Sequence, residues 1–174
     1  CIMAPPGTYI DTEGASIPKP CPSGKFLDSS GSSSASSCVS CPSGSYAVGS
    51  ESTSCTLCPT GMASQEVGAR NQSTCQLCSL GKFASSQGTS ECKFCLEGHY
   101  TQSRGAQECL ACPDGKYVAY MLGINDNSCT VCAPGTYAEA GSGECTGNPV
   151  GTFSGAGSSA PTPCPKGKYA GVEA

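Results

Sequence analysis

Regularly spaced cysteines constrain this chain more than any other feature of its sequence. Six Cys-x-x-Cys motifs recur along it, at 38/41, 55/58, 75/78, 92/95, 109/112 and 129/132. Leu, Ile, Val and Phe supply only 22 of the 174 residues, too few to build a conventional hydrophobic core. The 16 cysteines therefore predict a fold held together by disulfides, which requires an oxidising, extracellular or cell-surface compartment.

A second pattern, Cys-Pro-x-Gly-x-aromatic, divides the chain into repeats. It is complete at 21–26, 41–46, 112–117 and 164–169, and looser copies fill the gaps, with the repeat glycines 16 to 20 residues apart. Pro-x-Gly favours a turn, the aromatic residue favours an extended segment, and further glycines lie where a hairpin must reverse. Each unit is therefore predicted to be a β-hairpin, with longer tips in the longer units.

The predicted fold class is a small disulfide-rich array of about ten tandem β-hairpin repeats, with little helix, forming an elongated rod or solenoid. Because each unit would contact mainly its neighbours, the core is expected to be a series of small clusters rather than one interior. The predicted units are 1–20 (partial, without a disulfide), 21–40, 41–57, 58–77, 78–94, 95–111, 112–131, 132–147, 148–163 (without a disulfide) and 164–174 (partial, continuing beyond the chain).

Two irregular regions of the repeat indicate how the cysteines pair. Asn148 replaces the second cysteine of one motif and Pro161 the first cysteine of the next, and Ala4 and Pro18 show the same paired loss. If the second cysteine of each motif bonds forward to the first cysteine of the next, each paired loss removes one whole disulfide. This forward rule predicts Cys21–Cys38, Cys41–Cys55, Cys58–Cys75, Cys78–Cys92, Cys95–Cys109, Cys112–Cys129 and Cys132–Cys145.

The forward rule leaves Cys1 and Cys164 unpaired within the chain, and we expect both to bond to cysteines outside it. Zinc binding and thiol redox chemistry are alternative uses of Cys-x-x-Cys motifs. Zinc sites of four cysteines would leave four other cysteines unused and would not explain the paired losses. No helical pattern adjoins any motif, which disfavours a reactive thiolate. We therefore predict neither a metal site nor a cofactor.

The Cys-Pro-x-Gly-x-Tyr pattern followed by Cys-x-x-Cys resembles the ephrin-receptor-like cysteine-rich repeat, which is related to the first modules of tumour-necrosis-factor-receptor ectodomains. The resemblance covers nearly the whole chain. It implies a spacer of the kind found in receptor ectodomains, in large surface proteins of protists and algae, or in flagellar-hair proteins similar to mastigoneme components. The hairpins rich in Ser, Gly and Ala favour the last group.

Charge and composition exclude several classes of function. The 9 Lys/Arg and 13 Asp/Glu are scattered singly, so the sequence offers no basic stripe for nucleic acid or anionic lipid. The longest mostly apolar run, 117–124, is too short for membrane insertion. His99 is the only histidine and no nucleophile accompanies it, so we predict no enzyme activity and no catalytic residue. Asp11 and Glu13 are interpreted as turn residues rather than calcium ligands.

The sequence therefore predicts a non-enzymatic structural region within a larger secreted or surface glycoprotein, acting as a spacer or a mastigoneme-like filament wall element. Expected partners are other copies of the chain or other extracellular proteins, together with covalent glycans at the sequon of Asn71. The alternative is a receptor-type ectodomain module that binds a protein ligand. In either case Tyr120, Met121 and Leu122, an apolar group outside the repeat pattern, are the predicted partner contact.

Overall fold

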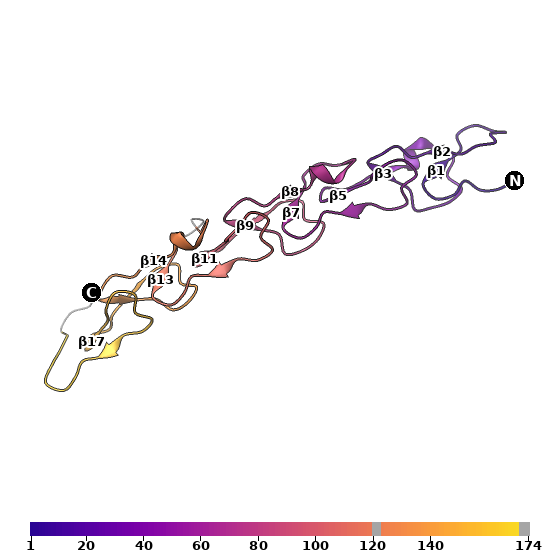
Figure 1. The fold of residues 1–174 in the computed structure, drawn as a ribbon. Coiled ribbons are helices and arrows are strands. Elements are labelled where there is room, and N and C mark those ends of the chain that lie inside the picture. The colour runs from indigo at the N-terminus through magenta and orange to yellow at the C-terminus, as the bar shows by residue number, and fades with distance from the viewer. Residues whose placement is uncertain (120–122, 171–174) are drawn as a thin grey trace. The chain divides into compact units, whose positions relative to one another are not determined.

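The computed structural model describes residues 1–119 and 123–170, which form nine two-stranded antiparallel hairpins (Figure 1). Every strand is two residues long. The hairpins are β1 (Thr8–Tyr9) with β2 (Lys19–Pro20), β3 (Lys25–Phe26) with β4 (Val39–Ser40), β5 (Ser45–Tyr46) with β6 (Thr56–Leu57), β7 (Met62–Ala63) with β8 (Gln76–Leu77), β9 (Lys82–Phe83) with β10 (Lys93–Phe94), β11 (His99–Tyr100) with β12 (Leu110–Ala111), β13 (Lys116–Tyr117) with β14 (Thr130–Val131), β15 (Thr136–Tyr137) with β16 (Thr146–Gly147), and β17 (Thr152–Phe153) with β18 (Thr162–Pro163). This confirms the predicted class of disulfide-rich β-hairpin repeats.

A tight turn that ends in the repeat glycine opens each hairpin, and in most repeats the Pro-x-Gly sequence forms it. In the second repeat the Lys25 amide donates to the Pro22 carbonyl at 3.1 Å, and Gly24 has φ of 82°. A four-residue turn with positive φ at its third residue is the type II geometry, which glycine adopts without a steric penalty. The glycine then leads directly into the first strand of the hairpin.

The longer repeats contain a short 3₁₀ turn that the sequence analysis did not predict. These turns are Ala35–Ser37, Gln72–Thr74 and Asp126–Ser128. Each ends at a cysteine, Cys38, Cys75 or Cys129, whose amide donates to the carbonyl of the first residue of the turn. The extra residues of the longer units are therefore used to form a capped turn before the return strand.

The chain divides into two compact units. The first contains Cys1–Leu77 and Ala84–Cys92, and the second contains Cys78–Phe83 and the chain from Lys93 onward. Within each unit the hairpins follow one another in chain order (Figure 1). The core is distributed into small clusters of cysteines, small residues and aromatic rings, as expected for a chain with so few aliphatic residues.

Successive hairpins are joined by three recurring backbone hydrogen bonds. In the pair at 41–57 and 58–77, Gly44 donates to the Ser64 carbonyl at 2.7 Å and Ala47 donates to Ala69 at 3.0 Å. The third bond runs backward, from the Gly68 amide to the Cys41 carbonyl at 2.7 Å. The tips of most hairpins are tied in this way to the base of the preceding one, so these neighbouring hairpins form a defined joint.

In several repeats the residue after the repeat aromatic is small and buried, a feature missed in the sequence. Ala47, Ala84 and Ala138 are each 2% exposed, and Thr101 is 1% exposed. The residue before the second cysteine of the Cys-x-x-Cys motifs shows the opposite trend, toward exposure. Leu57, Leu77, Phe94 and Val131 occupy this position and are each about half exposed, because the return strand of a two-stranded hairpin has no further strand beside it.

Glu51 is the one non-glycine residue with positive φ, 67°, among the described residues. Its amide donates to the Cys21 carbonyl at 3.1 Å, the same tip-to-base bond that Gly68 and Gly88 make in later hairpins. Glu51→Gly should therefore stabilise this hairpin by about 0.5–1 kcal/mol in its free energy of unfolding, because a side chain in this conformation is strained. Thermal unfolding measures the gain. Glu51→Ala is the control, and an equal gain from it would attribute the effect to charge and contradict this explanation.

Candidate functional site

The disulfide that closes each hairpin is the chemical feature that recurs most regularly along the chain. Six disulfides have Cα–Cα distances of 5.6 to 5.8 Å: Cys21–Cys38, Cys41–Cys55, Cys58–Cys75, Cys95–Cys109, Cys112–Cys129 and Cys132–Cys145. Cys78 and Cys92 are also disulfide-bonded. The six pairs are the partners that the forward rule predicts. Each disulfide closes a loop of 13 to 17 residues, so it ties the base of a hairpin to its return strand.

Each repeat aromatic covers the disulfide of the following hairpin in the three clusters that the structure defines. Tyr46 packs with Cys58, Cys75 and Ala69. Tyr100 packs in the same way with Cys112 and Cys129, and Tyr9 packs against Cys21 and Cys38. An aromatic ring gives a disulfide a large apolar surface to pack against. At these three positions the repeat aromatic therefore shields the disulfide of the next hairpin.

The repeat glycines make a second kind of contact, with the tip of the hairpin two places further along the chain. A Cβ atom added to Gly24 would lie 2.1 Å from the Gly68 carbonyl oxygen, and one added to Gly98 would lie 1.8 Å from that of Gly141. These separations are far below van der Waals contact. The glycines are thus required both for the turn and for the close approach of alternate hairpins within each unit.

A hydrogen-bonded pair occupies one position that lacks a disulfide. Asn148, 5% exposed, stands where a second cysteine is expected, and its amide donates to the Gly135 carbonyl at 3.0 Å as the cysteines do in other repeats. The hydroxyl of buried Ser154 lies 3.0 Å from Asn148 Oδ1. At the N-terminal irregular region Ala4 is also buried, and its carbonyl accepts from Gly31 at 2.7 Å. Both repeats keep these backbone hydrogen bonds although they lack the disulfide.

Restoring the missing bridge should stabilise the C-terminal repeats. The double variant Asn148→Cys, Pro161→Cys is expected to form a disulfide across a 13-residue interval and to raise the free energy of unfolding by about 3 kcal/mol, less the loss of the Asn148–Ser154 hydrogen bond. Denaturant unfolding with and without reductant measures the gain. Asn148→Cys alone is the control. A double variant that shows four free thiols under oxidising conditions, those of Cys1 and Cys164 and both introduced ones, would contradict the forward rule at this repeat.

Cys1 and Cys164 are free, Cys1 exposed and Cys164 partly buried, and their bonding to cysteines elsewhere stays a prediction. The cysteines of the six Cys-x-x-Cys motifs are disulfide-bonded, so they offer no thiolates to zinc. Among residues 1–119 and 123–170, no group of three or more His, Cys, Asp or Glu side chains is arranged to hold a metal ion.

Asn71 lies exposed at the start of the second 3₁₀ turn. Its Oδ1 accepts from the Ser73 amide at 3.0 Å and also from the Ser73 hydroxyl. The asparagine and the hydroxyl residue of the sequon are therefore held together in one turn on the surface. The predicted partner contact, Tyr120, Met121 and Leu122, lies outside the described residues.

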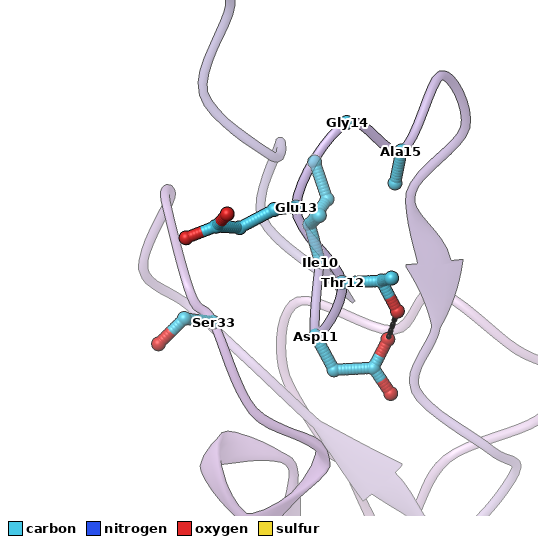
Figure 2. A pocket seen from close by; sticks show the side chains of 7 residues that line it. All are labelled: Ile10, Asp11, Thr12, Glu13, Gly14, Ala15 and Ser33. Carbon is cyan, nitrogen blue, oxygen red and sulfur yellow. Dashed lines mark hydrogen bonds between the residues drawn. The ribbon is translucent and has the colours of Figure 1, made fainter.

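The loop of the first hairpin that contains Asp11 and Glu13 forms a turn, as expected. Lys19 Nζ lies 2.8 Å from Asp11 Oδ1 and 3.0 Å from Oδ2, and this hydrogen bond lowers the pKa of Asp11. Figure 2 shows the Asp11 carboxylate accepting from Thr12 while the Glu13 side chain extends in a different direction, toward Ser33. The two carboxylates do not converge, so this loop carries no calcium-type ligand set.

A polar hollow in the second unit contains Glu97 and Glu144 together with Ser142 and Thr146. The Ser142 hydroxyl there donates to the Glu139 carbonyl at 2.7 Å. The single histidine, His99, has Nδ1 2.9 Å from the Glu97 carbonyl oxygen and lines a different, mainly apolar hollow with Phe83 and Leu96. The histidine and the two glutamates therefore line separate hollows.

Comparison with known families agrees with the repeat geometry. The family described as tyrosine-protein kinase ephrin type A/B receptor-like matches residues 34–75, 70–108 and 81–122, which together cover just over half of the chain. The chain belongs to the ephrin-receptor-like family. The overlapping matches follow from the tandem repeats, since each match spans more than two of the units. No curated protein matches the sequence.

Ephrin-receptor-like repeats are non-catalytic extracellular modules, and this chain consists of such disulfide-rich hairpin repeats. Its disulfide-bonded cysteines agree with an extracellular location. In the part of the chain that the structure describes, no helix has the length and apolar character needed to cross a membrane.

Proposed function

We propose that this ephrin-receptor-like array is a structural element, a disulfide-laddered spacer or filament wall segment within a larger secreted or surface protein. One observation carries the proposal. The same joint, consisting of a closing disulfide, an aromatic cover and backbone hydrogen bonds to the next hairpin, recurs along the chain in both units. A contact that repeats along the chain, with no cluster of reactive side chains among the described residues, suits a mechanical role.

The disulfides direct tension along a short covalent path. Between Cys41 and Cys55 the chain contains 14 residue steps, but the disulfide joins the two Cα atoms across 5.8 Å. Only the two residues between Cys55 and Cys58 then separate this bridge from the next. A pulling force therefore passes through sulfur atoms and short linkers, so the hairpin loops cannot unravel to lengthen the chain. The same closure keeps the loops from serving as extended protease substrates.

Glycans on the hairpin loops would keep this nearly coreless array soluble. The proposal places an N-linked glycan at Asn71, supported by the exposure of its side chain and by its hydrogen bonds to Ser73. Glycosidase treatment of the secreted chain should then lower its mass, and Asn71→Gln should abolish that change. An unchanged mass in the wild-type chain would exclude this glycan.

Electron microscopy of the native protein, released from its source without reduction, tests the structural role. Regular filaments with a helical repeat would support a wall element, and isolated thin segments joined to other domains would support a spacer. The receptor-type alternative predicts instead a stable complex with a second protein. Compact particles that hold a bound protein against these repeats would overturn the structural proposal.

A further inference from the structure

Hairpin folding separates the charges that are scattered along the sequence. Five of the nine basic residues lie in strands, and no strand of the described residues contains Asp or Glu. The strand cations are Lys19, Lys25, Lys82, Lys93 and Lys116. Every Asp and Glu among residues 1–119 and 123–170 lies in a loop or turn and is exposed. The strands are therefore positive and the loops negative, a division that the sequence alone did not indicate.

Most of these lysines have no carboxylate partner. Within the described residues the ion pair is Lys19 with Asp11. Lys82 instead places Nζ 4.1 Å from the centre of the Phe94 ring. Lys93 is exposed and Lys116 is half-buried. Their charges are thus available to an anionic group from outside the chain.

Apolar side chains accompany these lysines in the second unit. Phe94 is 47% exposed and pairs across its hairpin with Lys82, and Val131 is 50% exposed and pairs with Lys116. The two hairpins are in contact, since a Cβ atom on Gly81 would lie 3.5 Å from Ile124 of the later one. We call these two cross-strand pairs, Lys82 with Phe94 and Lys116 with Val131, the strand surface.

Two loops of the first unit have the complementary composition. Val48 and Val67 are each 66% exposed, and the exposed carboxylates of Glu51 and Glu66 lie in the same loops. The two loops belong to successive hairpins, which the hydrogen bond from Gly68 to Cys41 joins. We call residues 48–51 and 66–67 the acidic loops. They combine negative charge with unburied valine side chains.

We propose that the strand surface of one molecule binds the acidic loops of a second copy of the chain. This inference rests on the proposed structural role and names the surfaces through which copies associate. The lysines of the strand surface match the charges of Glu51 and Glu66. Its Phe94 and Val131 match the exposed valine side chains of the acidic loops. An anionic polysaccharide would match the lysines but would leave the apolar side chains uncovered. Because the two surfaces differ, the contact is heterologous and can repeat from copy to copy as an open, staggered assembly.

Sedimentation velocity on the disulfide-bonded chain tests this contact. The wild-type chain should associate in dilute salt and dissociate in concentrated salt, since the screening length falls from about 30 Å at 0.01 M to about 3 Å at 1 M ionic strength. Lys82→Glu with Lys116→Glu should weaken association about tenfold or more, as should Glu51→Lys with Glu66→Lys. An equimolar mixture of these two double variants should associate again, because each supplies the charge that the other has lost.

Lys166→Glu with Lys168→Glu is the matched control, because it changes the net charge by the same amount outside the strand surface and should leave association intact. Wild-type chain that stays monomeric in dilute salt would overturn the inference. Equal weakening by the control, or a mixture that does not associate, would overturn it as well. Electron micrographs judge the structural role separately. If filaments still form when these residues are replaced, the structural role is supported and this interface is excluded.

Discussion

Replacing both Cys58 and Cys75 with serine will unfold the hairpin between them and leave distant hairpins folded. The disulfide closes a 17-residue interval, so its loss should lower the local free energy of unfolding by about 3 kcal/mol. Tyr46 also loses the disulfide that it covers. Because hairpins contact mainly their near neighbours, the damage should stay local.

Limited proteolysis with mass spectrometry measures this effect. New cleavage sites are expected between residues 59 and 74, with little change near Cys112–Cys129. The control is Cys164→Ser, which removes a free thiol and should leave the cleavage pattern unchanged. Cooperative loss of the whole array would show that stability is shared along the chain and would contradict the local account.

Gly98→Ala should be among the most damaging single substitutions in the second unit, costing about 3 kcal/mol or more. Its Cβ atom would lie 1.8 Å from the Gly141 carbonyl oxygen. The tip at Gly141 would have to move away, which would also break the 2.9 Å hydrogen bond from its amide to Cys112. Denaturant unfolding followed by tyrosine fluorescence measures the loss.

Gly151→Ala provides a matched control for the backbone conformation. Gly151 has φ of 81°, similar to 74° at Gly98, but an added Cβ atom would have no neighbour within 4 Å among the described residues. This variant should lose only the penalty of a left-handed side-chain residue, about 1 kcal/mol. Equal losses in the two variants would show that conformation alone, and not the contact between alternate hairpins, requires the glycines.

The hairpins and their covalent pattern were predictable because defects in the repeat are themselves informative. The simultaneous loss of cysteine at Asn148 and Pro161 has a simple reason only if cysteines pair forward. The turn at Pro-x-Gly and the longer tips follow from local chemistry in the same way. What these signals share is that each depends on residues close together in the chain.

Contacts between hairpins were less predictable because they depend on three-dimensional proximity. Burial of Ala47 and Ala138 reflects the approach of a neighbouring tip, and small size gives no periodic signal of its own. The hydrogen bond between Asn148 and Ser154 replaces a bridge in a way that no spacing indicates. The opposite charges of strands and loops likewise emerge only when the hairpins form.

Peptide mapping of the native, unreduced protein tests the central claim, that hairpins are closed by forward disulfides. Digestion at acidic pH suppresses thiol exchange, because the attacking species is the thiolate. The account predicts linked peptides that join Cys41 to Cys55 and Cys112 to Cys129. A linkage within one motif, such as Cys38 to Cys41 or Cys55 to Cys58, would contradict it.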